Sequence, residues 1–316
     1  MYYIGIDLGG TNIAMALVDE DCKIVARAKV PTNAARTDVE IVDDMGRLAK
    51  QIIADNNLTE ADIYSIGIGL PGTMDRETGV SIYANNLPFR GTPIRTIMNK
   101  YVNTKVFIEN DANCAALGEA YAGAAKDVNH SLMLTLGTGL GGGIIIDKKI
   151  YCGFNGAGGE IGHKVIVVDG RPCTCGRNGC FESYCSATAL VKLTKEAMEQ
   201  DKASQMWQLC EGDISKAGGK TSFTAARQGD KTAQGVVDLY IKYLASGITD
   251  LINVFQPQVI SIGGGVSGEG DNLLAPLVKQ VQSEQYTKNI EQTTLCIAKL
   301  GNDAGIIGAA MLGKAR

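Results

Sequence analysis

The sequence lacks the features that mark an exported, membrane-bound or nucleic-acid-binding protein. No apolar run in its 316 residues reaches the roughly eighteen that a bilayer span needs. The opening residues, MYYIGIDLGG, carry no basic segment and no small-residue cleavage site of a signal peptide. The net charge is −4 with both signs interspersed, so there is no basic footprint for nucleic acid. We therefore expect a cytoplasmic protein whose partners are small molecules.

Proline is also scarce, and no proline- or serine-rich linker divides the chain. A length of 316 residues nevertheless exceeds one ordinary core, so two domains with a tight interface are expected. The 39 glycines are more than a globular protein of this length usually has. They cluster at 9–10, 137–143, 153–159 and 263–268, where they can serve turns and close backbone approach to a ligand.

Runs of strand length alternate with segments of helical periodicity, which predicts an α/β fold. Helices are expected over Val39 to Asn56, over 111–124 and over 302–313. The segment QVISIGGGVS (258–267) reads as a strand, a glycine turn and the start of a helix. The other strands are expected at 2–8, 13–19, 23–30, 64–70, 105–110, 131–136 and 293–300.

The opening pattern recurs in the middle of the chain. SLMLTLGTGLGGGIIID (131–147) has the strand, glycine turn and strand of YYIGIDLGGTNIAMALVD (2–19). Two similar halves that face one another would leave a cleft between two glycine-rich turns.

Each of these turns can offer several backbone N–H groups to a phosphate, as anion-binding nests do. Neither is a Walker A loop, and GTGLGGG leads into a strand rather than the helix of a dinucleotide fingerprint. The alternative is a pair of plain hairpin turns. The hydroxyls of Thr11 and Thr138 and the nearby Asp7 favour nucleotide phosphate, with Asp7 close to Mg²⁺, through water.

A candidate base lies in ENDAN (109–113), where a buried strand meets a helix. Asn110 and Asp111 would project from the carboxyl end of the strand, where open α/β sheets place their ligands. Phosphoryl transfer to an alcohol needs a carboxylate that accepts the hydroxyl proton. The same residues also suit a helix N-cap, and the stretch alone does not exclude that simpler role.

Histidine is the scarcest of the metal-ligating residues, with two in the chain, and one lies beside a cysteine cluster. His163 precedes Cys173, Cys175 and Cys180 in GHKVIVVDGRPCTCGRNGC (162–180). Three cysteines and one histidine match a structural zinc site, although the C-x-C-x₄-C spacing is unusual. Buried free thiols are the alternative, but a polar, glycine-rich loop is a poor core pattern. Cys185 is expected to face a helix core instead.

The motifs together resemble the ROK family of sugar kinases, and most closely its bacterial glucokinases. DLGGTN, ENDAN, TLGTGLGGG, GEIGH, CTCGRNGCFES, SIGGGVS and GNDAGIIGAA occur in the family's order across the chain. The resemblance implies an actin/hexokinase-like (ribonuclease H-like) α/β fold with duplicated domains around a central cleft. We expect an N-terminal domain over 1–118, onto which residues 302–316 pack back, and a larger C-terminal domain over 119–301.

The resemblance also implies the roles of individual residues. Asp111 matches the catalytic base, and His163, Cys173, Cys175 and Cys180 match the ligands of a structural zinc ion. The expected sugar contacts are Gly72, Asn86, Asn110, Asp111, Glu160, His163 and Glu182. The expected nucleotide contacts are Asp7, Gly9, Gly10, Thr11, Asn12, Thr138 and Gly139, with Gly264 and Gly265 on the adenosine side.

The resemblance thus implies transfer of phosphate from Mg-ATP to the primary hydroxyl of a hexose, and glucose is the expected substrate. N-acetylmannosamine, allose, mannose and fructose stay open as substrates, and polyphosphate as donor. The family also includes sugar-responsive repressors, but DLGG begins at Asp7 and leaves no room before it for their DNA-binding domain. A redox or metal-storage protein leaves the phosphate turns unexplained. Members of the family are often dimers or tetramers, so the resemblance implies a homo-oligomer.

Overall fold

The computed structural model describes residues 1–84 and 86–315, which divide into two compact units. The first comprises Met1–Met133, Gly143–Gly159 and Lys299–Arg316, and the second comprises Leu134–Gly142 and Glu160–Ala298. These bounds differ from the expected split at 118/119, so the extent of the two domains stays a prediction. No helix in the described part of the chain is long and apolar enough to cross a membrane.

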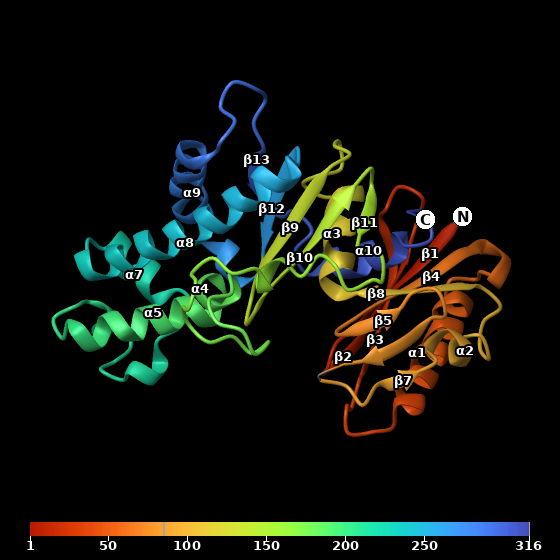
Figure 1. The fold of residues 1–316 in the computed structure, drawn as a ribbon. Coiled ribbons are helices and arrows are strands. Elements are labelled where there is room, and N and C mark those ends of the chain that lie inside the picture. The colour runs from red at the N-terminus through yellow and green to blue at the C-terminus, as the bar shows by residue number, and fades with distance from the viewer. Residues whose placement is uncertain (85, 316) are drawn as a thin grey trace. The chain divides into compact units, whose positions relative to one another are not determined.

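The first unit is built on a five-stranded sheet of order β3-β2-β1-β4-β8 (Figure 1). β1 pairs antiparallel with β2, and β2 with β3, whereas β4 runs parallel to β1 and to β8. The parallel strands therefore end at one edge of the sheet, and the chain turns there into the candidate functional residues. The strands of this sheet are β1 (Tyr2–Leu8), β2 (Asn12–Val18), β3 (Ile24–Pro31), β4 (Ile63–Leu70) and β8 (Lys105–Asn110).

Helix α1 (Asp38–Asp55) covers part of this sheet. It begins at Thr37, whose hydroxyl accepts the backbone N–H of Glu40 while the Glu40 carboxylate accepts the N–H of Thr37. This capping box satisfies two N–H groups that the first turn leaves without partners. Further along the helix, an apolar face from Ile41 to Ile53 joins the core of the sheet. The remaining elements of the unit are β5 (Thr73–Asp75), β6 (Val80–Tyr83), β7 (Arg90–Thr92), α2 (Ile94–Met98), α3 (Asp111–Tyr121), β11 (Lys149–Tyr151) and α10 (Ala304–Met311).

The C-terminal helix α10 packs against α3, β1 and β4, and glycines make this close approach possible (Figure 1). A Cβ on Gly308 would lie 1.7 Å from the carbonyl oxygen of Cys114, and one on Gly67 would lie 1.8 Å from that of Ala309. Any side chain at these positions would therefore push the backbones apart. The last helix thus holds α3, and with it the start of α3 at Asp111.

A second five-stranded sheet has the order β11-β10-β9-β12-β13, which repeats the arrangement of the first. The boundary between the units falls within β9 (Ser131–Leu136) and β10 (Leu140–Ile146). The order matches the internal repeat found in the sequence. The second unit also contains α4 (Glu182–Cys185), α5 (Ala187–Gln200), α6 (Met206–Leu209), α7 (Thr221–Arg227), α8 (Lys231–Phe255), β12 (Val259–Gly263), α9 (Asp271–Glu284) and β13 (Thr294–Ile297).

The predicted elements agree with the structure to within a few residues at their ends. One detail differs: the chain after the glycine turn at 263–265 forms a short 3₁₀-helix (Gly265–Glu269) before α9 begins. Cys185 is fully buried in α4, and its carbonyl oxygen accepts a hydrogen bond from Tyr240, as expected of a core residue.

Candidate functional site

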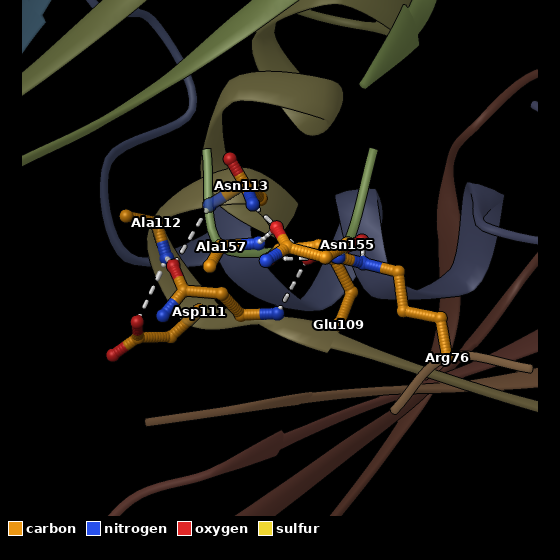
Figure 2. Close-up of polar contacts among 9 residues, drawn as sticks. Arg76, Glu109, Asp111, Ala112, Asn113, Asn155 and Ala157 are labelled. Atoms are coloured by element: carbon orange, nitrogen blue, oxygen red, sulfur yellow. Dashed lines mark hydrogen bonds and ion pairs between the residues drawn. The ribbon is translucent and has the colours of Figure 1, made fainter. Parts of the chain in front are cut away.

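Asp111 is the first residue of α3, directly after β8 ends at Asn110. The N-cap is Asn110, whose Oδ1 accepts the backbone N–H groups of Ala112 at 2.9 Å and Asn113 at 3.3 Å. Figure 2 shows the Asp111 carboxylate on the other side of this turn, where its Oδ1 accepts the N–H of Ala112 at 2.9 Å. Asn110 therefore takes the capping role that the sequence left open between the two residues, and the exposed carboxylate of Asp111 is free for another task.

The protein surroundings raise the pKa values of the Asp7 and Asp111 carboxyl groups. The Asp111 side chain reaches solvent, but the protein atoms around it still desolvate its carboxylate and raise its pKa, although hydrogen bonds from the backbone N–H groups of Ala112 and of Asp111 itself oppose the rise. Desolvation, followed by the negative charge of Asp111, also raises the pKa of Asp7. A cation near Asp7 would offset this repulsion, so the environment of Asp7 fits an oxygen-ligated Mg²⁺.

The first glycine turn lines a cavity of about 400 Å³ together with Asp7. Its hairpin is closed by the N–H of Gly9, which donates to the carbonyl oxygen of Asn12 at 3.0 Å. Thr11 is exposed in the turn, and Gly10 leaves room beside Asn86. The structure thus places Asp7, Gly9, Gly10, Thr11 and Asn12 around one cavity, as a phosphate site requires.

A residue that the sequence did not reveal braces this turn. Thr32 is fully buried, its hydroxyl donates to the carbonyl oxygen of Gly9 at 2.6 Å, and its N–H donates to that of Thr11 at 2.9 Å. The residue directly after β3 therefore holds the turn by two hydrogen bonds. No local motif distinguishes this threonine from any other at a strand end.

Replacing Thr32 by valine should weaken nucleotide binding. Valine keeps the volume and the backbone contact but removes the hydroxyl, which leaves the Gly9 carbonyl without its donor at a cost of about 1–3 kcal/mol. We expect KM for ATP to rise about tenfold or more, because about 1.4 kcal/mol corresponds to a factor of ten. Steady-state kinetics with glucose in excess measures this. An unchanged KM for ATP would show that the turn does not need this brace.

The remaining candidates of the first unit lie at a turn between β4 and β5 and in the segment after β6. Gly72 has φ +98°, and a Cβ there would lie 2.0 Å from the carbonyl oxygen of Tyr83. Only glycine fits both the backbone conformation and the space. Asn86 is exposed, and its Cβ would lie 3.8 Å from a Cβ placed on Gly10.

In the second unit, Glu182 holds the glycine turn of 137–143. Its Oε2 accepts the backbone N–H of Leu140 at 2.8 Å, and a Cβ on Gly139 would lie 2.4 Å from the same oxygen. Thr138 is exposed at the tip, while its carbonyl oxygen accepts a hydrogen bond from Thr188. The expected sugar-binding carboxylate is therefore attached to the turn that carries the expected phosphate contacts.

The other glycine turn of this unit follows β12. Gly264 has φ +84°, and a Cβ there would lie 2.5 Å from the backbone of Leu136, so this position also requires glycine. Nothing lies within 4 Å of a Cβ on Gly265, which leaves open space beside its backbone. Gly264 is thus packed closely against neighbouring backbone while Gly265 is accessible, an arrangement that suits a turn next to a bound nucleotide.

The cysteine cluster forms a compact set of metal ligands. One ligand atom from each of His163, Cys173, Cys175 and Cys180 lies within 4.8 Å of the others. The Sγ atoms of Cys175 and Cys180 are 3.6 Å apart, as are Cys173 Sγ and His163 Nδ1. Zinc–sulfur bonds of 2.3 Å in a tetrahedron place two sulfurs about 3.8 Å apart, so the cluster has the dimensions of a zinc site.

Several backbone contacts fold the loop so that these ligands meet. Two isolated β-bridges, Val165 with Cys180 and Pro172 with Asn178, close the loop. Upstream, the N–H of His163 donates to the carbonyl oxygen of Glu160, which precedes the short 3₁₀-helix Ile161–His163 and has an exposed side chain. With Nδ1 of His163 directed at the sulfurs, Nε2 is the nitrogen left for a second partner.

Two further residues near Asp111 were not predicted. Glu109, in β8, is buried, and Arg76, just after β5, forms a paired ionic contact with it at 2.5 Å (Figure 2). The two residues are 33 positions apart, so the local sequence around either one does not predict that they pair.

Comparison with known proteins agrees with this geometry. The model of the ROK family matches residues 3–316. The glucokinases of Halalkalibacterium halodurans and Thermotoga maritima are each 36% identical; the alignments cover 99% of this chain, and 95% and 97% of theirs. A solved ROK family glucokinase from Streptomyces griseus, in complex with glucose and AMPPNP, is 34% identical with a TM-score of 0.78 over the whole of both chains.

These likenesses confirm the predicted fold class, which is α/β of the actin/hexokinase-like type. They extend over nearly the whole chain, so they do not depend on the motifs alone. The chain belongs to the ROK family.

Proposed function

We propose that this protein is an ATP-dependent hexose kinase that converts glucose to glucose 6-phosphate. The observation that carries the proposal is its similarity to two glucokinases and to a glucose-bound one over nearly the whole chain. The free carboxylate of Asp111 at the carboxyl end of a parallel strand supports it independently, because open α/β sheets bind their ligands there.

In the proposed reaction Asp111 accepts the proton of the sugar's primary hydroxyl. The hydroxyl oxygen then forms a bond to the γ-phosphorus of ATP while the bond from that phosphorus to the β-γ bridging oxygen breaks, which leaves ADP. The transition state spreads charge over the phosphoryl oxygens, so catalysis depends mainly on positioning and on charge stabilisation. The carboxylate of Asp111 is available for this role because Asn110, and not Asp111, caps the helix.

The nucleotide contacts in the proposal come from three glycine turns. The turns at Gly9–Asn12 and at Thr138–Gly139 hold the β- and γ-phosphates through backbone N–H groups, and Gly264 and Gly265 lie on the adenosine side. Asp7 would hold Mg²⁺, and the ion would neutralise phosphate charge when bound.

Polar side chains and the backbone of Gly72 select the sugar. Gly72, Asn86, Asn110, Glu160, His163 and Glu182 are the proposed contacts with its hydroxyls. A sugar with one hydroxyl inverted leaves some of these groups unpaired, and this gives strong discrimination. Zinc, held by His163, Cys173, Cys175 and Cys180, is structural in the proposal, because four protein ligands leave no open coordination position. We place the enzyme in the cytoplasm as a homo-oligomer.

The pH dependence follows from the raised pKa of Asp111. A base works in its deprotonated form, so activity must fall as pH drops through the pKa of the carboxyl. Because burial raises that pKa, the acid limb of kcat/KM should lie above the ordinary aspartate value of 3.8. A pH profile with glucose and saturating ATP measures the limb. A limb at or below the ordinary value, or the same limb in Asp111→Asn, would contradict the assignment.

A panel of sugars tests the function. ADP release with Mg-ATP is measured over glucose, mannose, N-acetylmannosamine, N-acetylglucosamine, allose and fructose, with polyphosphate as the alternative donor. We expect the highest kcat/KM with glucose and ATP. A higher value for another sugar would change the substrate but not the mechanism. ATP binding without transfer to any of them would favour a non-catalytic sugar sensor.

A further inference from the structure

The carboxylate of Glu109 is buried two residues before the candidate base, and within the described residues it contacts the backbone of Asn110, the side chain of Asn113 and Arg76. Its side chain is only 3% exposed. Oε1 accepts the backbone N–H of Asn110 at 2.8 Å and the side-chain amide of Asn113 at 3.0 Å. Arg76 donates to both carboxylate oxygens, each at 2.5 Å. Figure 2 shows this set beside the turn that carries Asp111.

Arg76 has a third contact, to a different segment. Its Nη1 donates to the carbonyl oxygen of Gly156 at 3.0 Å, within the glycine-rich stretch that follows β11. Gly156 has φ +80°, and a Cβ there would lie 2.3 Å from the same nitrogen. The stretch is also fixed within itself, because Asn155 Oδ1 accepts the N–H of Ala157 at 3.2 Å (Figure 2). The guanidinium thus lies directly against a backbone that leads on to Glu160.

We propose that Arg76 is a positioning residue for phosphoryl transfer, which fixes the Asn110–Asp111 turn through Glu109 and the 153–159 segment through Gly156. The inference rests on the proposed function, because it assigns Arg76 to the same reaction. Arg76 is not among the proposed substrate contacts, so its effect would pass through Glu109 and Gly156, which it holds.

The chemistry of arginine explains why this position needs a guanidinium. Its planar fork can satisfy both oxygens of Glu109 and still direct a further N–H at Gly156, which a lysine ammonium cannot do from one point. Without the guanidinium, the N–H of Asn110 can still donate to Glu109, but the carboxylate of Glu109 is no longer held in one orientation. A small shift of a catalytic group is enough to reduce the rate on the order of a hundredfold.

Arg76→Lys is the first test, because it keeps the positive charge beside the buried carboxylate. We expect kcat to fall and KM for glucose to rise, with kcat/KM reduced on the order of tenfold to a hundredfold. KM for ATP should stay unchanged, because the phosphate turns are outside this network. A variant that only loses stability would lower kcat with no change in KM for glucose, and that result would overturn the proposal.

Arg95→Met is the matched control. Arg95 is also a partly buried arginine of the first unit, and it donates to the carbonyl oxygens of Arg76 and Val106, but it contacts neither Glu109 nor Gly156. Equal effects in Arg95→Met and Arg76→Lys would show that loss of any such arginine suffices, which would contradict a positioning role for Arg76.

Chemical rescue gives a sharper test. A cavity of about 290 Å³ is lined by Arg76, Glu109 and Cys152, so a guanidinium ion can reach the space that Arg76→Ala vacates. We expect added guanidinium, at non-denaturing concentration, to restore kcat/KM in a saturable manner, and sodium chloride at equal concentration not to. An absence of rescue in a folded Arg76→Ala protein would count against the proposal.

Gly156→Ala approaches the network from the other side and does not depend on Arg76→Ala folding. Its methyl group would push on the guanidinium that Glu109 holds, so we expect the kinetic signature of Arg76→Lys, and a double variant no worse than the poorer single one. Independent, additive effects would refute the shared network. If the wild-type protein phosphorylates no sugar, the proposed function fails; if it is active and these variants match it, the inference alone fails.

Discussion

Replacing Asp111 by asparagine should nearly abolish turnover and leave glucose binding intact. Asparagine keeps the size of the side chain and can still accept the N–H of Ala112, but it cannot take the proton of the attacking hydroxyl. A general base contributes about 10²- to 10⁴-fold, so kcat should fall by at least that factor. Steady-state kinetics gives kcat, and calorimetric titration gives the affinity for glucose.

The stability of the same variant should not fall. Folding raises the pKa of Asp111, so the ionised carboxylate is less favourable in the folded protein than in the unfolded chain. At neutral pH a neutral asparagine removes this penalty, and Tm should stay equal or rise. Asp271, the first residue of α9, provides the matched control as Asp271→Asn. A kcat for Asp111→Asn near that of the wild type would refute the base assignment.

Loss of Cys175, a proposed zinc ligand, should lower both stability and sugar affinity. Cys175 is exposed, so its thiol contributes little packing, and a large effect of Cys175→Ala must come from the metal site. Structural zinc sites contribute directly to folding. We expect less than one zinc per chain, a lower Tm, and a KM for glucose raised about tenfold or more, because His163 loses its fixed orientation.

Zinc content by mass spectrometry, thermal unfolding and kinetics measure these three effects. Cys152→Ala is the control, because Cys152 is a partly buried cysteine outside the cluster. In the wild type, a chelator should release three protected thiols with each zinc. Wild-type protein that carries no zinc, or a Cys175→Ala protein with unchanged stability and affinity for glucose, would refute the metal site.

Much of the fold could be predicted because its signals are local. Strand β1 is an apolar run bounded by a glycine turn, and α1 combines a capping box with an apolar face, so both were located to within a residue or two. The candidate base was located for the same reason, since ENDAN stands where a buried strand passes into a helix. The cysteine cluster is compact in sequence as well as in space.

The residues that hold these groups could not be predicted, because their partners are distant in the chain. Thr32 reaches back to Gly9, and Arg76 reaches forward to Glu109 and Gly156. The strand pattern shows that Glu109 follows an apolar run (106–108), but not that a guanidinium lies opposite it. The resemblance to a family predicts which groups meet substrate, and the structure adds residues that support those groups.

Identification of the product tests the central claim most directly. Glucose and Mg-ATP are incubated with the protein, and the phosphorus and carbon NMR spectra of the mixture are recorded, with 6-deoxyglucose in a parallel sample. We predict glucose 6-phosphate and ADP in equal amounts, and no sugar phosphate from the deoxy sugar. Phosphate on another hydroxyl, or hydrolysis of ATP without any sugar phosphate, would contradict the account.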